Sequence, residues 1–127
     1  MKKTLTGVLA VVALTLSACG GGDYQPVDQT HTGVLTDADL QHSGRTCDAY
    51  EVSVGRGWRI TAEMTSDWDN YLYLAKGFDV ESNDDTNGTN ARIDTNVDLA
   101  GVYTIYACAF SSGRGPYTLR ITTRAGS

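Results

Sequence analysis

The chain has few basic residues and only one long apolar stretch. Its 127 residues carry ten Lys and Arg side chains against fifteen Asp and Glu, a formal net charge of −5. Binding to nucleic acid and adsorption to an anionic membrane surface both need clustered cations, so we expect neither. No apolar run reaches the ~20 residues that a transmembrane helix requires. No window combines apolar residues at helical spacing with capping signals at both ends, which argues against a helical domain.

The arrangements that carry nucleophilic or acid–base chemistry are also missing. There is no Gly-x-Ser-x-Gly motif, and neither histidine of the chain stands in a triad context. Neighbouring acids at Asp67 and Asp69, or at Asp84 and Asp85, could be interpreted as a glycosidase pair. Two catalytic carboxyls must face each other across a sugar, however, and neighbours on one loop are far more typical of polar turns. We therefore expect no enzyme. A hydrolase ranks as a distant third hypothesis, behind a non-catalytic binding or structural module and a calcium-stabilised module.

The apolar stretch lies near the N-terminus, from Val8 to Leu14, and follows the basic residues Lys2 and Lys3. A charged start, a short apolar run and small residues after it describe a secretory signal. The run ends in Leu-Ser-Ala-Cys at Cys19, which resembles the lipobox of bacterial lipoproteins. That resemblance implies removal of residues 1–18 and a diacylglyceryl group on Cys19. The alternative is an ordinary signal peptide with a chance cysteine.

The mature chain is more acidic than the full sequence, because the signal removes Lys2 and Lys3 and no acid. Eight basic and fifteen acidic side chains remain, a formal charge of −7. We expect a protein of the bacterial cell envelope whose membrane contact is the lipid on Cys19. Gly20 in the next position resembles the sorting signal for the outer membrane, if the cell has two membranes.

Two cysteines, Cys47 and Cys108, remain in the domain after Cys19 is lipidated. In an exported chain such a pair is most simply a disulfide, since the cell envelope is oxidising in many bacteria. The alternative of free thiols or half of a zinc site is weaker, because zinc usually takes four ligands with cysteines close in sequence. If the strand alternation around Cys47 and Cys108 holds, both side chains point away from the core face.

From Gly33 onward, short apolar alternations are punctuated by Gly, Asn, Asp and Ser. Period-two alternation is typical of strands with one buried face, and it recurs over residues 50–54, 58–64, 71–74, 103–107 and 117–122. The sequence therefore predicts an all-β antiparallel sandwich of about seven or eight strands. We expect a signal peptide at 1–18, a lipidated flexible tether at 19–32, the sandwich at 33–124 and a tail at 125–127.

The loop that begins at Asn83 is the candidate metal site. Its Asn-x-Asp-x-Asn-Gly pattern places side-chain oxygens on Asn83, Asp85 and Asn87, and position twelve of such a loop is Asp94. Calcium prefers six to eight oxygen ligands, and this spacing can supply several of them. The first ligand is Asn, the twelfth is Asp rather than Glu, and no helices flank the loop. A polar turn is the favoured interpretation and a calcium site the alternative; no other cofactor is expected.

Trp68 lies between Asp67 and Asp69 at an expected strand start, where an exposed ring could stack on a sugar or a protein side chain. Aromatic residues favour strands in any case, so burial is the simpler interpretation. Trp58 alternates with core residues, and we expect it to be buried.

Three ordered segments resemble the bacterial pre-peptidase C-terminal domain. They are Gly33-Val34-Leu35 followed by Cys47-Asp48-Ala49-Tyr50-Glu51-Val52, Asp69-Asn70-Tyr71-Leu72-Tyr73-Leu74 followed by Asn83-Asp84-Asp85, and Ala100-Gly101-Val102-Tyr103-Thr104-Ile105 followed by Gly115-Pro116-Tyr117-Thr118-Leu119. The resemblance implies a jelly-roll-like sandwich that commonly accompanies secreted peptidases. We expect no peptidase domain beside the sandwich within these 127 residues.

The sequence thus favours a non-catalytic envelope lipoprotein that presents a β-sandwich for binding or structural support. The alternative is a calcium-stabilised adhesion module or a module that binds a glycan or a protein. Apart from the membrane, the sequence identifies no partner, because sandwich folds of this kind serve unrelated tasks.

Overall fold

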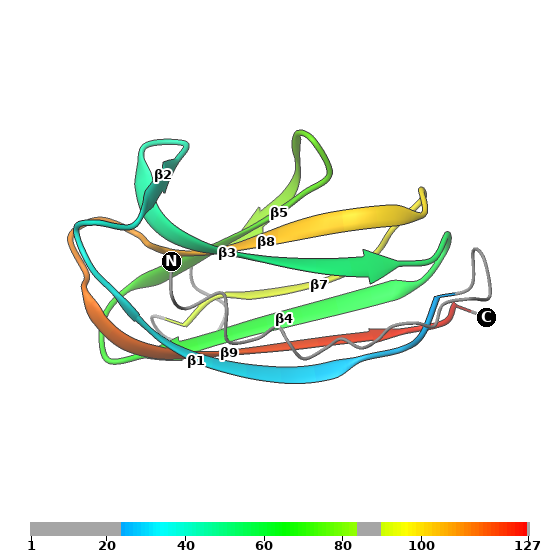
Figure 1. Ribbon diagram of the computed structural model, residues 1–127, viewed down its shortest axis with the longest axis horizontal. Helices are drawn as coiled ribbons and strands as arrows, with labels where there is room; N and C mark the ends of the chain where they lie inside the picture. Colours follow the sequence, from blue (N-terminus) through cyan, green and yellow to red (C-terminus); the bar gives the residue numbers. More distant parts are fainter. Residues whose placement is uncertain (1–23, 84–89, 127) are drawn as a thin grey trace.

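The structure is a computed structural model that describes residues 24–83 and 90–126. Its strands are β1 (Asp28–Leu35), β2 (Leu40–His42), β3 (Arg45–Val54), β4 (Arg59–Ser66), β5 (Asn70–Ala75), β6 (Asp79–Asn83), β7 (Arg92–Asn96), β8 (Gly101–Ala109) and β9 (Gly115–Arg124). They form two antiparallel sheets that face each other (Figure 1). Sheet A has the order β1-β9-β4-β7, and sheet B has the order β2-β3-β8-β5-β6.

The connections give the jelly-roll arrangement. Apart from the short β2, each sheet has four strands, and the chain passes repeatedly from one sheet to the other. Neighbouring strands within a sheet are therefore mostly distant in sequence, as β1 and β9 are. The predicted antiparallel, jelly-roll-like sandwich is confirmed.

The core lies between the sheets and follows the alternation in the sequence. On β4, Ile60, Ala62 and Met64 are buried, while Glu63 between them is exposed. β9 buries Tyr117, Leu119 and Ile121 in the same way. Facing residues of both sheets thus form one continuous apolar cluster, as expected for a sandwich.

The ordered domain begins earlier than predicted. β1 starts at Asp28, inside the segment 19–32 that we expected to be a flexible tether, and pairs with β9 from Asp28 onward. The inward-facing residues before Leu35 include Gln29 and His31, which are only partly buried. Because these positions are not apolar, the strand shows no hydrophobic period, and backbone pairing with β9 defines it instead.

The described residues contain nine strands, more than the seven or eight predicted. The additional strands are short or exposed: β2 has three residues, and β6 is largely exposed along its length. Such strands at sheet edges carry too little alternation to be recognised from sequence. Within residues 24–83 and 90–126, no helix is long and apolar enough to cross a membrane.

Candidate functional site

The predicted disulfide is present between Cys47 on β3 and Cys108 on β8. The two residues are direct cross-strand partners, and the bond joins positions 61 residues apart in sequence. As the alternation indicated, both side chains lie on the outer face of sheet B, opposite the core. Both are nevertheless fully buried, because Tyr73, Tyr71 and Tyr106 pack around them in a second apolar cluster. In the chain-entropy model a loop of this length contributes roughly 4 kcal/mol to stability.

A tight turn folds β2 over this outer face. Ser43 and Gly44, the two residues of the β2–β3 hairpin, both have positive φ angles, of 52° and 81°. Positive φ at both central positions defines a type I′ turn, whose twist suits a two-residue hairpin. The β2–β3 hairpin and the β5–β6 hairpin both rise from the sheet on the side away from sheet A (Figure 1).

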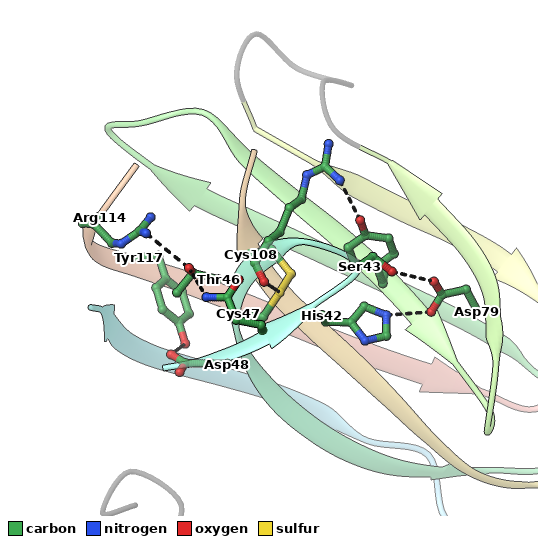
Figure 2. Close-up of a disulfide and its surroundings, with 12 residues drawn as sticks. His42, Ser43, Thr46, Cys47, Asp48, Asp79, Cys108, Arg114 and Tyr117 are labelled. Atoms are coloured by element: carbon green, nitrogen blue, oxygen red, sulfur yellow. Dashed lines mark hydrogen bonds and ion pairs between the residues drawn. A yellow bond between two sulfur atoms is a disulfide. The ribbon is translucent and has the colours of Figure 1, made fainter. Parts of the chain in front are cut away.

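His42 connects these two hairpins. Its Nε2 lies 2.8 Å from Asp79 Oδ1, although β2 and β6 are the opposite edge strands of sheet B (Figure 2). The imidazole also stacks on Tyr106, with ring centroids 3.8 Å apart, and meets Tyr73 edge-on at 4.7 Å. Sheet B is therefore curled outward until side chains from its two edges meet above the disulfide.

Arg45 packs against two neighbouring aromatic rings beside this cluster, Tyr71 and Phe110, whose centres are 6.0 Å apart. Its guanidinium carbon lies 4.2 Å from the ring centre of Tyr71 and 5.0 Å from that of Phe110. Its Nη1 donates a hydrogen bond to Tyr73 Oη at 2.8 Å. Phe110 remains 39% exposed, so the cluster has an accessible apolar side. We call His42, Arg45, Tyr71, Tyr73, Tyr106 and Phe110 the aromatic face.

The aromatic face was not predicted from the sequence. Tyr71, Tyr73 and Tyr106 lie next to Leu72, Leu74 and Ile105 in the alternation and so point away from the core, but aromatic residues favour strands in any case. Arg45 and Phe110 were missed as well. Arg45 lies two residues before Cys47 and Phe110 two residues after Cys108, so strand alternation places each on the same side of sheet B as the neighbouring cysteine. The phase of the two cysteines was the signal that could have identified this face.

The motif residues of the pre-peptidase-like segments meet inside the sandwich around Tyr117. Its hydroxyl donates a short hydrogen bond to Asp48 Oδ2 and lies 2.5 Å from the hydroxyl of Tyr50 (Figure 2 shows Tyr117 and Asp48). A Cβ on Gly33 would lie only 2.7 Å from Tyr117 Oη, so glycine is needed there. Burial, and then the hydrogen bond to Asp48, raise the pKa of Tyr117 well above the usual value. These motif residues therefore build an internal polar network rather than a ligand site.

His31 lies at the edge of the same network. Its ring packs on that of Tyr50 at a centroid distance of 4.5 Å, and its Nε2 lies 3.0 Å from Gln29 Oε1. Partial burial lowers the pKa of His31, because the charged imidazolium loses hydration there. His31 is therefore a half-buried partner in strand packing whose neutral form is favoured.

Asn70, from the second motif, is fully buried and holds the two residues that precede β7, Asn90 and Ala91, against the start of β5. Its Oδ1 accepts a hydrogen bond from the backbone N–H of Ala91 at 2.7 Å. Its Nδ2 donates to Ser66 Oγ at 2.7 Å and to Asn90 Oδ1 at 3.0 Å. Each polar atom of the buried amide thus has a partner, as a buried polar group requires.

The structure describes only part of the predicted calcium site. Asp85 and Asn87 lie outside the described residues. Asn83 Oδ1 accepts a hydrogen bond from the backbone N–H of Arg92 at 3.1 Å. Asp94 accepts from Arg59 Nε at 2.7 Å and Arg92 Nη1 at 3.3 Å, and the hydrogen bond from Arg59 is the main cause of a lowered Asp94 pKa. Two guanidinium groups disfavour a divalent cation at Asp94, and calcium binding stays a prediction.

No group of three or more His, Cys, Asp or Glu side chains suited to a metal occurs within residues 24–83 and 90–126. Cys19 precedes the described part of the chain, so its lipidation also stays a prediction.

Trp68 does not stand free as a stacking platform: it is partly buried against the core, and a Cβ on Gly113 would lie 2.6 Å from its ring. Trp58 is likewise partly buried, with Tyr24 edge-on to it at 6.3 Å.

Comparison with known proteins gives structural neighbours only. No family model matches the sequence, and no curated protein matches it significantly. The pre-peptidase C-terminal domain of a Bacillus anthracis collagenase has a TM-score of 0.57 and 18% identity, covering 75% of this chain and 89% of that one. The periplasmic inhibitor of g-type lysozyme PliG from Aeromonas hydrophila has a TM-score of 0.56 and 12% identity, covering 80% and 88%. PliG from Salmonella Typhimurium has a TM-score of 0.50 and 13% identity, covering 78% and 87%.

These likenesses establish the fold. The chain has the fold of the pre-peptidase C-terminal domain, as the ordered motifs indicated, and PliG proteins share it. At such low identity, the likeness assigns no activity, ligand or location to this chain.

Proposed function

We propose that this protein is a non-catalytic lipoprotein of the bacterial cell envelope that binds a protein partner through its aromatic face. The signal sequence and the lipobox ending at Cys19 support the location in the cell envelope. The disulfide between Cys47 and Cys108 fits an oxidising compartment outside the cytoplasm.

The observation that carries the binding proposal is the packing of the Arg45 guanidinium over the rings of Tyr71 and Phe110. Tyrosine, phenylalanine and arginine are enriched at protein interfaces, and tyrosine and arginine dominate their energetic centres. The contacts with both rings and with Tyr73 hold the guanidinium before any partner arrives. Little side-chain entropy is then lost on binding, which favours affinity.

The structural neighbours support binding of a protein partner rather than catalysis. One is an accessory domain of a collagenase, and two are inhibitors of g-type lysozyme. The mature charge of −7 further favours a basic partner, because complementary charge steers association. A g-type lysozyme is therefore the first partner to test.

The test measures binding of the mature protein to a purified g-type lysozyme, together with inhibition of cell-wall lysis. Phe110→Ser should weaken binding at least about tenfold, since a partly exposed aromatic at an interface centre is a typical hot spot. Leu99→Ser is the matched control, because Leu99 is 60% exposed and precedes β8, whereas Phe110 follows it. Equal loss in both variants, or wild-type affinity in Phe110→Ser, would contradict a role of the aromatic face.

Absence of any binding to g-type lysozyme would reject that partner. The aromatic face would then be tested by cross-linking in intact cells, with a photoreactive residue at position 110 and, as control, at position 99. A cross-linked protein specific to position 110 supports the proposal, and identical products from both positions oppose it.

A further inference from the structure

The outer face of sheet A carries a depression with a different character from the aromatic face. Its volume is about 460 Å³, and strands β4, β7 and β9 line it. Its charged lining residues are Arg59, Glu63, Arg92, Asp94, Arg120 and Arg124. Four arginines against two carboxylates give a formal charge of +2, within a mature chain of −7. Half of the eight basic side chains of the mature protein therefore gather around this one depression.

Most of these arginines already have carboxylate partners. Arg92 Nε donates to Glu63 Oε2 at 2.9 Å, and Arg92 and Arg59 share Asp94. At the next strand, Arg120 forms two hydrogen bonds with Asp28, at 3.0 and 2.9 Å. These ion pairs form a lattice on the outer face of sheet A, and the carboxylates in it neutralise most of the positive charge of the arginines.

Arg124 does not fit that lattice. It is exposed and directly opposite Arg59 in the pairing of β4 with β9. Within residues 24–83 and 90–126, no carboxylate forms an ion pair with it. Like charges at directly opposed positions of an antiparallel pair destabilise the sheet, and neighbouring strands are only ~4.8 Å apart. Asp94 offsets part of this repulsion by pairing with Arg59, but Arg124 keeps its positive charge in the depression without a carboxylate partner among the described residues.

We propose that this depression binds an oxyanion, a phosphate or carboxylate group, between Arg59 and Arg124. Guanidinium groups form paired, charge-assisted hydrogen bonds with both kinds of anion. Arg59 is already positioned by Asp94, so one side of the site is fixed before the anion binds. The site lies on sheet A, whereas the aromatic face lies on sheet B, so the two proposals stand independently.

The test is thermal unfolding of the mature protein with inorganic phosphate, pyrophosphate or citrate, at constant ionic strength set with sodium chloride. Constant ionic strength is necessary because salt screens surface charges in any case. A ligand that binds only the folded state raises its midpoint. At least one of the three anions should therefore raise the wild-type midpoint, and the most effective one identifies the group.

Arg124→Gln should weaken the apparent affinity for that anion at least tenfold, whereas Arg56→Gln should keep the wild-type response. Arg56 is an exposed arginine outside the depression, so the control makes the same change in net charge. Without the anion, the midpoint of Arg124→Gln should equal or exceed that of the wild type, because a like-charge pair has been removed. A wild type indifferent to all three anions, or an Arg124→Gln response equal to the wild type, would overturn the proposal.

Discussion

His42 on β2 and Asp79 on β6 join the two edges of one sheet. Their side chains meet at 2.8 Å, although three strands separate β2 from β6 in sheet B. The contact closes the curled sheet above Cys47 and Cys108, and the same imidazole stacks on Tyr106. His42 therefore covers Tyr73 and Tyr106, two of the tyrosines that bury the disulfide.

Removal of His42 should expose the disulfide. We expect His42→Ala to accelerate reduction of Cys47–Cys108 by dithiothreitol under native conditions, because both the stacking and the link to Asp79 are lost. The loss of stability should be about 1–2 kcal/mol, from one aromatic contact and one exposed polar pair. Asp79→Asn is the control, since the stack on Tyr106 remains. It should change the reduction rate much less, and equal rates in wild type and His42→Ala would contradict the account.

A methyl group at Gly33 should displace Tyr117. The added Cβ would lie 2.7 Å from Tyr117 Oη, and the hydroxyl cannot move without weakening its bond to Asp48. We expect Gly33→Ala to lower the free energy of unfolding by about 1–3 kcal/mol, as overpacking does. A double-mutant cycle by urea denaturation checks the cause. The added Cβ would also lie 2.8 Å from Tyr117 Cζ and 3.1 Å from Cε2. In a Tyr117→Leu background, which removes the hydroxyl and both of these ring carbons, the penalty should shrink, and an unchanged penalty would place the strain elsewhere.

Stability should depend on pH through His31. Burial lowers its folded-state pKa below the unfolded value of 6.5, so the unfolded chain binds a proton more readily. The contribution is constant above about pH 6.5 and is lost progressively as the pH falls from there toward the folded pKa. Urea denaturation at several pH values from 8 to 5 should show this fall, and His31→Gln should flatten it. Identical pH profiles would show that other groups dominate in this range.

Calcium binding is tested with the wild type and Asp85→Ala. If the loop binds calcium, a hundredfold excess over the dissociation constant raises stability by about 2.7 kcal/mol, and Asp85→Ala loses this gain. Asp94→Ala is a poor probe, since it removes an ion-pair partner of both Arg59 and Arg92 with or without calcium. A wild-type melting midpoint that millimolar calcium and chelator leave equal means that the loop is only a polar turn.

The parts of the fold that bury one strand face could be predicted from sequence. Ile60, Ala62 and Met64 define β4 by alternation, and the phase of Cys47 and Cys108 placed the disulfide on the outer face. β1 could not be predicted in full, because backbone pairing with β9 orders its first residues without an apolar face.

The aromatic face could not be predicted for a related reason. His42 and Asp79 meet because the sheet curls, and no local pattern encodes a contact between opposite edge strands. The motif residues Asp48 and Tyr117 indicated the fold correctly, but only their geometry reveals that they bond to each other.

The intact mass of the protein purified from membranes checks the lipid anchor and the disulfide together. We expect a chain that begins at Cys19, carries acyl groups there, and gains no alkylation at Cys47 or Cys108 until it is reduced. The acyl mass should be absent from Cys19→Ala. An unacylated wild-type chain, cleavage at another residue, or two alkylated thiols without reduction would contradict an envelope lipoprotein with a disulfide-linked sandwich.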